Sequence, residues 1–295
     1  MNINNTLQSN STQLTLVDYL NKDLVKNQIS NVVGKTEIQR FITSIISAVN
    51  VNAELKECTK QSILSAALLG ETLKLSPSPQ LGQYYMIPFG RKNNKKAQFV
   101  LGYKGYLQLA IRSGFYKKIN VLSIKQGELV SYNPLEEEIQ VNLITDYEKR
   151  EKTETIGYFA YIEYMNGFRK NLYWTKSKME SHARKYSTSY AKDLKDGTNY
   201  SYWIKDFDSM AYKTMLRQIL SKWGNLNSDL QMAIDADMAV IEADGSKTYI
   251  DDSLEKSNYN FNDNNAEEVQ EKNIEDKPET VPKTTYKSAY DALFN

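Results

Sequence analysis

The sequence contains one cysteine, Cys58, and one histidine, His182, and this scarcity excludes several kinds of site. A lone cysteine cannot form an internal disulfide, and the two residues together cannot supply the four Cys or His ligands that a structural zinc ion usually takes. We therefore expect both residues in ordinary packing roles, in a protein of the reducing cytoplasm. No stretch approaches the ~20 apolar residues that span a membrane, and the polar N-terminus does not resemble a secretory signal. We expect a protein that is neither secreted nor membrane-inserted.

Acidic residues are missing from one long stretch of the chain. None occurs between Glu71 and Glu128, whereas ten cations do: Lys74, Arg91, Lys92, Lys95, Lys96, Lys104, Arg112, Lys117, Lys118 and Lys125. The charge is also segregated overall, because residues 1–250 carry 32 basic and 25 acidic residues and residues 251–295 carry five basic and eleven acidic ones. Cations without acidic partners repel one another unless something anionic binds, so the pattern favours an anionic ligand.

The periodicity of apolar residues predicts three regions. Residues 1–35 are rich in Asn, Ser and Thr, which is typical of a loosely ordered arm, here with a short helix around 16–25. The core is predicted to span 36–245. Residues 246–295 are predicted to form a flexible acidic tail, because they hold too little apolar surface to offset the entropy of ordering. At its end four apolar side chains recur at helical spacing, which fits either a partner-docking segment or a disordered terminus: Tyr286, Tyr290, Leu293 and Phe294.

The core is predicted to be α+β, with an antiparallel β-sheet and hairpins packed on a helical bundle. One hairpin joins 84–87 to 99–101 through a basic turn, and a second places Asn166-Gly167, a pair favoured in type I′ turns, between 156–165 and 168–174. Further strands are expected at 118–124 and 139–143. Helices are predicted at 36–49, 59–73, 102–114, 200–223 and 228–242. Capping boxes are predicted at two of these, from Thr36 with Gln39 and from Ser228 with Gln231.

Two sequence patterns suggest an enzyme, but neither meets the spacing that its chemistry requires. Gly34-Lys35-Thr36 resembles the end of a phosphate-binding loop, but Ile29 stands where that loop needs its first glycine. The pairs Asp206/Asp208 and Asp235/Asp237 lie in predicted helices, where side chains two apart point about 200° apart and cannot share one metal ion. Ion pairs or helix caps are favoured over a metal-dependent nuclease. We predict no covalent chemistry, since the single histidine would have to serve every catalytic role.

Aromatic and basic residues alternate within the acid-free stretch, as in Tyr103-Lys104 and in the Phe-Tyr-Lys-Lys run at 115–118. Cations neutralise phosphates, and rings stack on bases at ~1 to 3 kcal/mol per base. The alternation favours binding of single-stranded nucleic acid over a merely solvated basic face, without choosing between DNA and RNA.

The predicted helix at 202–223 is apolar nearly all round and should be central to the fold. Lys213 and Arg217 are four residues apart on one side of it, so we expect them to project together and hold a phosphate. A structural ion pair with Asp206 or Asp208 is the competing interpretation.

Three segments resemble the RecT family of phage and prophage single-strand annealing recombinases. They are the strand ending in Pro88-Phe89-Gly90, the sequence GYKGYLQLAIRSG at 102–114, and the stretch 203–224. The resemblance runs from about Leu55 to Asp237. It implies the α+β single-strand annealing fold, helical or ring-shaped oligomers, and ATP-independent annealing of complementary DNA in recombination and repair. A passive single-stranded nucleic-acid coat or an RNA chaperone is the alternative.

The resemblance also implies which residues contact DNA: Lys104, Arg112, Lys205, Lys213 and Arg217, with Tyr103 as a stacking or positioning ring. The basic hairpin tip adds Arg91, Lys92, Lys95 and Lys96 to the predicted DNA contacts. No cofactor is required, and Mg²⁺ enters only as a modulator of DNA binding. The expected partners are single-stranded and annealed duplex DNA, further copies of this chain, and, through the C-terminal tail, a 5′ to 3′ exonuclease and the host single-strand binding protein.

Overall fold

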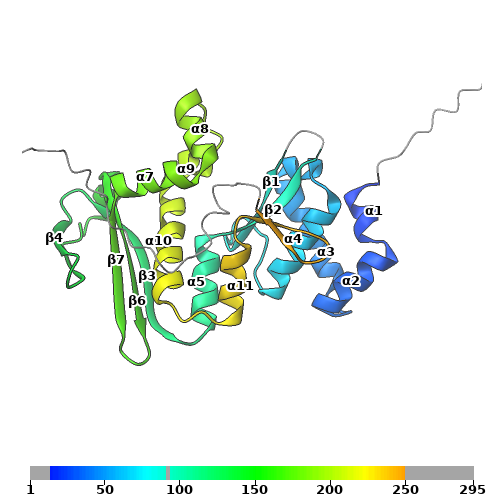
Figure 1. The fold of residues 1–295 in the computed structure, drawn as a ribbon, viewed down its shortest axis with the longest axis horizontal. Coiled ribbons are helices and arrows are strands. Elements are labelled where there is room, and N and C mark those ends of the chain that lie inside the picture. Colours follow the sequence, from blue (N-terminus) through cyan, green and yellow to red (C-terminus); the bar gives the residue numbers. More distant parts are fainter. Residues whose placement is uncertain (1–13, 91–93, 250–295) are drawn as a thin grey trace, which may run out of the picture. The chain divides into compact units, whose positions relative to one another are not determined.

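The structure, a computed structural model, describes residues 14–90 and 94–249. The predictions for Arg91, Lys92 and the tail beyond 249 lie outside the described residues. The described residues belong to one compact unit of helices and antiparallel strands, which confirms the predicted α+β class (Figure 1). In these two ranges we find no helix with the length and apolar character of a membrane span.

The first part of the unit is helical. Its elements are α1 (Leu16–Leu20), α2 (Asp23–Val33), α3 (Ile38–Val51), the 3₁₀ helix η1 (Ala53–Glu57) and α4 (Lys60–Thr72). Helix α2 packs against α3 and α4, and Leu20, Val25 and Ile29 are buried. The short helix predicted around 16–25 is confirmed by α1 and the start of α2. Helix α2 continues to Val33 instead of giving way to a loosely ordered arm, because Val25 and Ile29, four apart, give it an apolar side that joins the core.

Two helix starts differ from the predicted capping boxes. Helix α3 begins after Glu37 without a side-chain cap, so the Thr36–Gln39 box does not form. Helix α11 (Ser228–Ala236) is capped one residue earlier than predicted, where Asn227 Oδ1 accepts a hydrogen bond from the Leu230 amide at 2.9 Å. Asn and Ser both cap helices well, so the sequence alone did not separate the two positions.

One sheet joins distant parts of the chain in the order β1-β2-β8-β9, with every pair antiparallel. Its strands are β1 (Tyr84–Phe89), β2 (Lys96–Leu101), β8 (Ala239–Ile241) and β9 (Lys247–Tyr249). The hairpin β1–β2 confirms the prediction. The last two strands correct it, since β8 occupies the end of the helix predicted at 228–242 and β9 lies in the predicted tail. The chain turns between α11 and β8 at Met238, a non-glycine residue with a φ of 70°.

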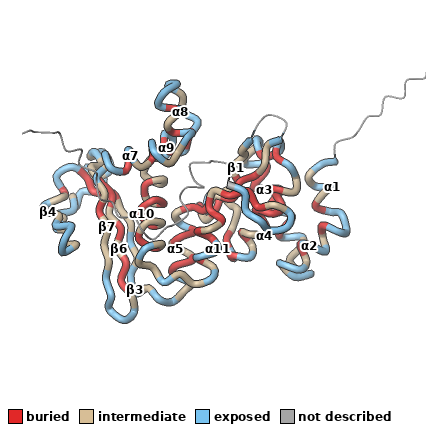
Figure 2. Tube along the Cα trace, viewed as in Figure 1, coloured by how far each residue is buried: buried red, intermediate tan, exposed pale blue. Residues whose placement is uncertain are grey.

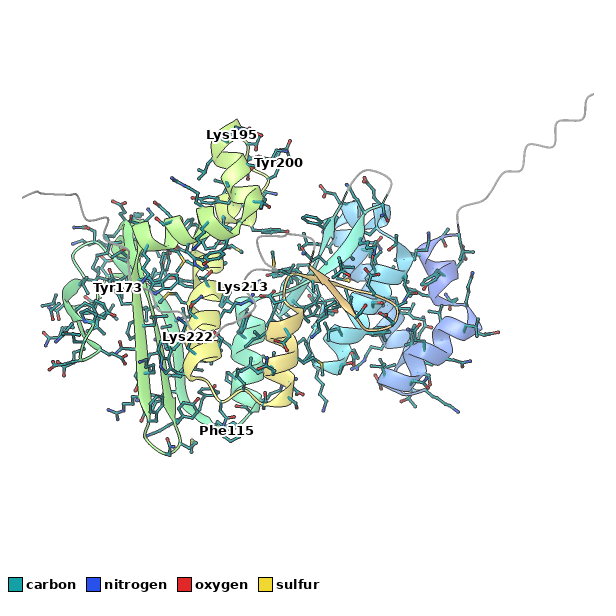
Figure 3. All side chains as sticks on the ribbon, viewed as in Figure 1. Phe115, Tyr173, Lys195, Tyr200, Lys213 and Lys222 are labelled. Carbon is teal, nitrogen blue, oxygen red and sulfur yellow. The ribbon has the colours of Figure 1, made fainter. Side chains whose placement is uncertain are left out.

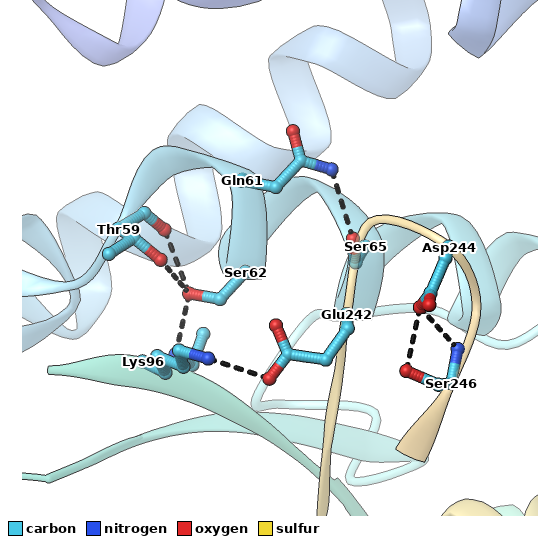
Figure 4. A network of polar contacts seen from close by, with 9 residues as sticks. Thr59, Gln61, Ser62, Ser65, Lys96, Glu242, Asp244 and Ser246 are labelled. Carbon is cyan, nitrogen blue, oxygen red and sulfur yellow. Dashed lines mark hydrogen bonds and ion pairs between the residues drawn. The ribbon is translucent and has the colours of Figure 1, made fainter. Parts of the chain in front are cut away.

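A polar network fastens this sheet to α4 (Figure 4). Ser62 Oγ accepts hydrogen bonds from Thr59 Oγ1 at 2.9 Å and from the Ala97 amide of β2 at 2.8 Å. Lys96 pairs with Glu242, just after β8, at 2.6 Å. The network gives a strand amide and a half-buried cation their partners, which keeps them from destabilising the core.

A second sheet has the order β3-β6-β7, and a separate hairpin pairs β4 with β5. Their bounds are β3 (Tyr116–Lys125), β4 (Leu129–Asn133), β5 (Glu138–Val141), β6 (Thr155–Tyr164) and β7 (Arg169–Thr175), with α6 (Tyr147–Lys152) between β5 and β6. The Asn166-Gly167 hairpin is confirmed, but its turn is not type I′, because of that pair only Gly167 has positive φ, at 90°. The Gly167 amide donates to the Tyr164 carbonyl at 3.0 Å, which is typical of a type I turn closed by a left-handed glycine.

Helix α10 (Phe207–Trp223) lies between this sheet and α5 (Tyr103–Arg112) and contacts β3, β6, β7 and α5. It is buried along much of its length (Figure 2). Helix α7 (Lys176–Tyr186) covers the same face of the sheet, and α8 (Thr188–Asp196) and α9 (Tyr202–Lys205) follow it. The helix predicted at 200–223 is broken at Asp206, whose φ of −152° is not helical and whose carboxylate caps α10 by accepting from the Ser209 amide at 3.1 Å.

Candidate nucleic-acid interface

The start of α5 lies directly against the backbone that leads into β1. A Cβ atom added to Gly102 would stand 2.1 Å from the Gly82 carbonyl oxygen, and one added to Gly105 would stand 2.1 Å from that of Gln83. Both glycines of the GYKG sequence are thus required by close packing. Because the helix begins so near this loop, Lys104 in its first turn is fixed beside Gly82 and Tyr85.

Aromatic and basic side chains from three elements meet at this point. Burial raises the pKa of the Tyr85 phenol on β1, and the nearby phenols of Tyr202 and Tyr103 raise it further. The Lys205 ammonium lies 5.6 Å from the centre of the Tyr202 ring, within the range of a cation–π contact. We call this group of five residues the tyrosine–lysine surface: Tyr85, Tyr103, Lys104, Tyr202 and Lys205.

The two cations of this surface are available to a ligand. Lys104 and Lys205 are exposed, and neither forms an ion pair within 14–90 and 94–249. Tyr202 is 49% exposed. Two acids lie near the rings: Asp206, whose carboxylate already accepts two hydrogen bonds from Ser209, at 3.1 and 2.7 Å, and Glu54, whose charge acts on Tyr202. The surface therefore combines two exposed ammonium groups with one exposed ring, the two kinds of group that bind single-stranded nucleic acid.

A chain of ring contacts ties this surface to the core. Tyr103 packs edge-on against Tyr212 with ring centres 5.8 Å apart, and Tyr212 packs against Tyr158 at 6.0 Å. The contacts continue to Phe207 at 6.1 Å and from there to Trp203 at 5.1 Å. Tyr103 is only partly exposed, and its ring packs α5 against α10.

Lys213 does not project from α10 as predicted. It is 7% exposed, and its ammonium pairs with Asp237 at 2.8 Å, on the side of α10 that faces α5 and α11 (Figure 3). Asp237 also accepts from Arg217 at 3.0 Å, from the Tyr106 hydroxyl at 3.1 Å and from the Leu101 amide at 2.9 Å. The competing interpretation, a structural ion pair, is confirmed for Lys213. The acid was predicted wrongly, because the partner is Asp237 and not Asp206 or Asp208.

This buried group, which we call the Asp237 cluster, joins β2, α5, α10 and the end of α11. Burial lowers the pKa of the Lys213 ammonium, and the Asp237 carboxylate opposes that shift. Arg217 is the cluster's outer member, with 23% of its side chain exposed. Its charge also acts on His182, whose pKa is lowered to about 4, first by burial and then by Arg217. His182 packs between the rings of Trp174 and Tyr186, the ordinary role predicted for it.

The other predicted cations that the structure describes, Arg112, Lys95 and Lys96, have partners within the fold. The Arg112 guanidinium donates to the carbonyls of Leu73 at 2.5 Å and Lys74 at 3.1 Å, at the C-terminal end of α4, where a cation is stabilising. Lys95 pairs with Glu57 at 2.7 Å and Lys96 with Glu242 at 2.6 Å. The acid-free stretch of sequence thus draws its acids from elsewhere in the chain.

The paired aspartates have separate structural roles, as predicted, although Asp206 and Asp237 are caps rather than interior helical residues. Asp208 accepts a hydrogen bond from the Tyr158 hydroxyl at 2.6 Å, and Asp235 accepts one from Gln231 at 2.8 Å. Cys58 is a buried free thiol whose pKa is raised to about 11 by burial. Within the described ranges, no three His, Cys, Asp or Glu residues are grouped as metal ligands.

Two residues of the tyrosine–lysine surface were not singled out from the sequence. Tyr85 could have been found from strand alternation, which turns it away from buried Tyr84, and Tyr202 from its position three residues before Lys205 on one helical turn. Asp237 was considered only as half of a possible metal pair, and its role in the core could not be predicted, because its donors Leu101 and Tyr106 lie more than 130 residues away.

The fold and this surface define an α+β protein that presents an exposed ring and two cations together, the combination that proteins use to bind single strands. The RecT family model matches residues 39–253, and the chain belongs to that family. The chain is 42% identical over 237 residues, or 80% of its length and 75% of the relative's, to the protein of Bacillus subtilis (strain 168) described as "Uncharacterized protein YqaK". It is 23% identical over 227 residues, 75% of its length and 80% of the relative's, to "Protein RecT" of Escherichia coli (strain K12).

Proposed function

We propose that this protein binds single-stranded DNA and promotes ATP-independent annealing of complementary strands in homologous recombination, working as an oligomer. The tyrosine–lysine surface is the observation that carries the proposal, because it places Lys104 and Lys205, which form no ion pair within the described residues, beside the exposed ring of Tyr202. Membership of the RecT family supports the choice of DNA over RNA.

In this mechanism Lys104 and Lys205 hold the phosphates of one strand, and Tyr85 and Tyr202 contact its bases or sugars. Such contacts are independent of sequence, so an incoming strand is tested by base pairing rather than by side chains. Each contact is weak, and repetition along adjacent subunits multiplies their effect. Arg112, Lys95 and Lys96 contribute to the positive field of the protein while they stabilise its fold.

The proposal involves no covalent chemistry and requires no cofactor. Mg²⁺ acts only by competing with the protein for phosphates, or by shielding the two strands from each other. Annealing should therefore proceed without a nucleotide, and its rate should fall as salt is added, because phosphate contacts release counterions that salt opposes.

The test is annealing of two complementary labelled oligonucleotides, without ATP and at fixed salt. The variant Lys104→Glu with Lys205→Glu should bind single strands about tenfold or more weakly and anneal correspondingly slowly. Lys149→Glu with Lys152→Glu, on the exposed last turn of α6, changes the net charge equally and should keep most of the activity. Equal loss in both variants would show that net charge matters rather than the tyrosine–lysine surface.

Two other results would replace the proposal. Wild-type protein that binds the strands and slows their pairing is a passive coat, and cleavage of end-labelled DNA with magnesium would identify a nuclease. Lys213 is unsuitable for this test, because reversing a buried charge beside Asp237 would report on folding rather than binding.

We further propose that the C-terminal tail binds the partner exonuclease and the host single-strand binding protein. The boundary for a deletion is Tyr249, the last residue of β9, rather than the predicted position 245. A chain lacking residues 250–295 should anneal bare DNA at nearly the wild-type rate and lose stimulation by those partners. Loss of annealing on bare DNA would place the tail in the core activity.

A further inference from the structure

A second group of cations lies on the face of the β3-β6-β7 sheet opposite α10. Strand alternation divides β6 into two sides. Tyr158 and Tyr164 face the helices, where their hydroxyls donate to Asp208 and to the Trp223 carbonyl, both at 2.6 Å. Phe159, Tyr161 and Glu163 therefore face the other way. Helices α7 and α10 cover the first side, so the second is the outer face of the sheet (Figure 1).

Three cations surround one carboxylate on this outer face. Glu163 is 2% exposed, and its oxygens lie 3.2 Å from the Lys117 ammonium, 3.5 Å from the Arg169 guanidinium and 4.0 Å from the Lys118 ammonium. The three cations are 55%, 68% and 67% exposed, respectively. One negative charge among three positive ones leaves two in excess, and these face solvent. The tightness of the Lys117 contact shows in Glu163 itself, since the hydrogen bond from Lys117 lowers the pKa of its carboxyl.

The strand register arranges the rest of this face in rows. Glu163 stands opposite Lys118 on β3 and Arg169 on β7, which gives a row of charges across the sheet. The next row is Asn120, Tyr161 and Asn171, and the next is Leu122, Phe159 and Tyr173. The rings of Phe159 and Tyr161 lie 6.5 Å apart with planes only 12° from parallel. The β4–β5 hairpin covers part of these rows, because the Asn171 amide donates to the Glu137 carbonyl, and Tyr173, 7% exposed, packs against Tyr132 with ring centres 5.2 Å apart. The charged row with Asn120, Tyr161 and Phe159 stays open, and cations beside near-parallel rings suit a phosphate backbone with its bases laid across the strands.

We propose that this outer face, through Lys117, Lys118 and Arg169, binds a second single strand of DNA while the tyrosine–lysine surface holds the first. The inference rests on the proposed function and names a second DNA site for it. The two sites come from different parts of the fold, because α10 and the sheet lie between the outer face and α5. The excess of two charges favours an anionic occupant, and the near-parallel rings of Phe159 and Tyr161 favour DNA over an acidic peptide.

The experiment measures simultaneous binding of two strands that cannot pair. Full-length protein is loaded with donor-labelled oligothymidylate at saturation and then titrated with acceptor-labelled oligothymidylate, and energy transfer reports two strands on one assembly. The variant Lys118→Gln with Arg169→Gln removes both excess charges and keeps Lys117, the closest partner, on Glu163, so the buried carboxylate stays paired. We expect it to bind the first strand as wild type does and the second about tenfold or more weakly, with the salt slope of the second event reduced by about 1.4.

Two further variants make the result specific. Glu163→Gln keeps the shape of the side chain but leaves three excess charges, so it should bind the second strand more tightly than wild type, whereas a purely structural role would predict the opposite. Lys149→Gln with Lys152→Gln on α6 is the matched control and should leave both binding events unchanged.

The outcomes separate this inference from the proposed function. If wild type binds and anneals DNA but Lys118→Gln with Arg169→Gln takes up the second strand normally, the outer face is not a DNA site and the proposed function stands. A second strand that binds only after residues 250–295 are removed would overturn DNA as the natural occupant and assign the face to the acidic tail. Wild type that binds no single strand at all removes the proposed function and this inference together.

Discussion

Among the described residues, the Asp237 cluster and the Glu163 cluster each bring several cations to one buried carboxylate, and they differ in where the cations lie. In the Asp237 cluster the side chains of Lys213 and Arg217 are 8% and 23% exposed, and the carboxylate accepts two further hydrogen bonds. In the Glu163 cluster the three cations are more than half exposed. Desolvated cations are bound to the fold, whereas exposed cations are free to exchange water for a phosphate. The exposed fraction of the side chain, rather than the residue type, therefore distinguishes a cation that stabilises the fold from one that can bind a ligand.

The largest expected effect is on the interior side of this comparison. Asp237→Asn removes the negative charge that pairs with Lys213 and Arg217, and breaking a buried pair in this way should cost about 3 to 5 kcal/mol of the free energy of unfolding. Urea unfolding followed by circular dichroism measures it. Asp235→Asn, two residues earlier with its contact to Gln231 at the surface, should cost less than about 1 kcal/mol. Coinciding unfolding midpoints would mean that the Asp237 cluster does not hold the fold together.

The next effect is the pH dependence of stability, through the outer edge of the same cluster. Burial and the nearby Arg217 lower the pKa of His182 to about 4, against 6.5 in the unfolded chain. The unfolded state therefore binds more protons between these values, and stability should fall as the pH drops from about 6.5 toward 4, by roughly 1 to 2 kcal/mol after allowance for solvent screening.

No other histidine contributes to this pH dependence, because His182 is the only one in the sequence. Thermal unfolding of wild type between pH 6.5 and 5, above the range where most carboxylates titrate, should show the loss, and His182→Gln should flatten it. A slope that His182→Gln leaves unchanged would assign the effect to other groups.

A smaller effect tests whether Lys213 serves structure alone. Lys213→Met fills the same space without charge and leaves Asp237 paired with Arg217, so stability should change by about 1 kcal/mol or less. The annealing rate at fixed salt should stay close to that of wild type, in contrast with Lys104→Glu combined with Lys205→Glu. A folded Lys213→Met protein that no longer binds DNA would restore the original prediction of a phosphate contact.

The smallest effect on stability is expected in the exposed cluster. Lys118 is 67% exposed and 4.0 Å from Glu163, so Lys118→Ala should change the free energy of unfolding by no more than about 0.5 kcal/mol. A large loss on urea unfolding would show that the Glu163 cluster is structural after all, and the two clusters would no longer differ in kind.

Local patterns in the sequence were enough to predict several of the local elements, although strand β4 and helices α6, α7 and α8 were missed. The hairpin β1–β2, helix α5 and the turn at Gly167 follow from periodicity and from glycine and asparagine signals within a few residues. Lys104 and Lys205 were named as DNA contacts from the family resemblance rather than from local patterns, and the structure shows both to be exposed. The α+β class also follows from these elements, because alternating strands and amphipathic helices were visible along the chain.

Long-range pairing accounts for what was missed. From the sequence, residues 239–241 were predicted as the end of a helix, but in the structure they pair with β2. Lys213 was predicted to project from its helix, but it pairs with Asp237 from another element. The break at Asp206 was hidden because residues 200–223 are apolar on both sides of it, while the capping contact to Ser209 is a matter of geometry. Local periodicity cannot reveal which distant group will satisfy a polar side chain.

The closure of the β1-β2-β8-β9 sheet has a consequence for how the protein is made. Gln98 of β2 bonds Met238, next to β8, across 140 residues of intervening chain. Contacts of such separation form late, since the loop between them must be closed at an entropic cost. During synthesis the inner edge of β2 therefore stays unpaired until residues 239–241 have been made, and an open strand edge is a site of misassembly with other nascent chains. Strand β8, which is synthesised near the end of the described unit, therefore completes the pairing of β2.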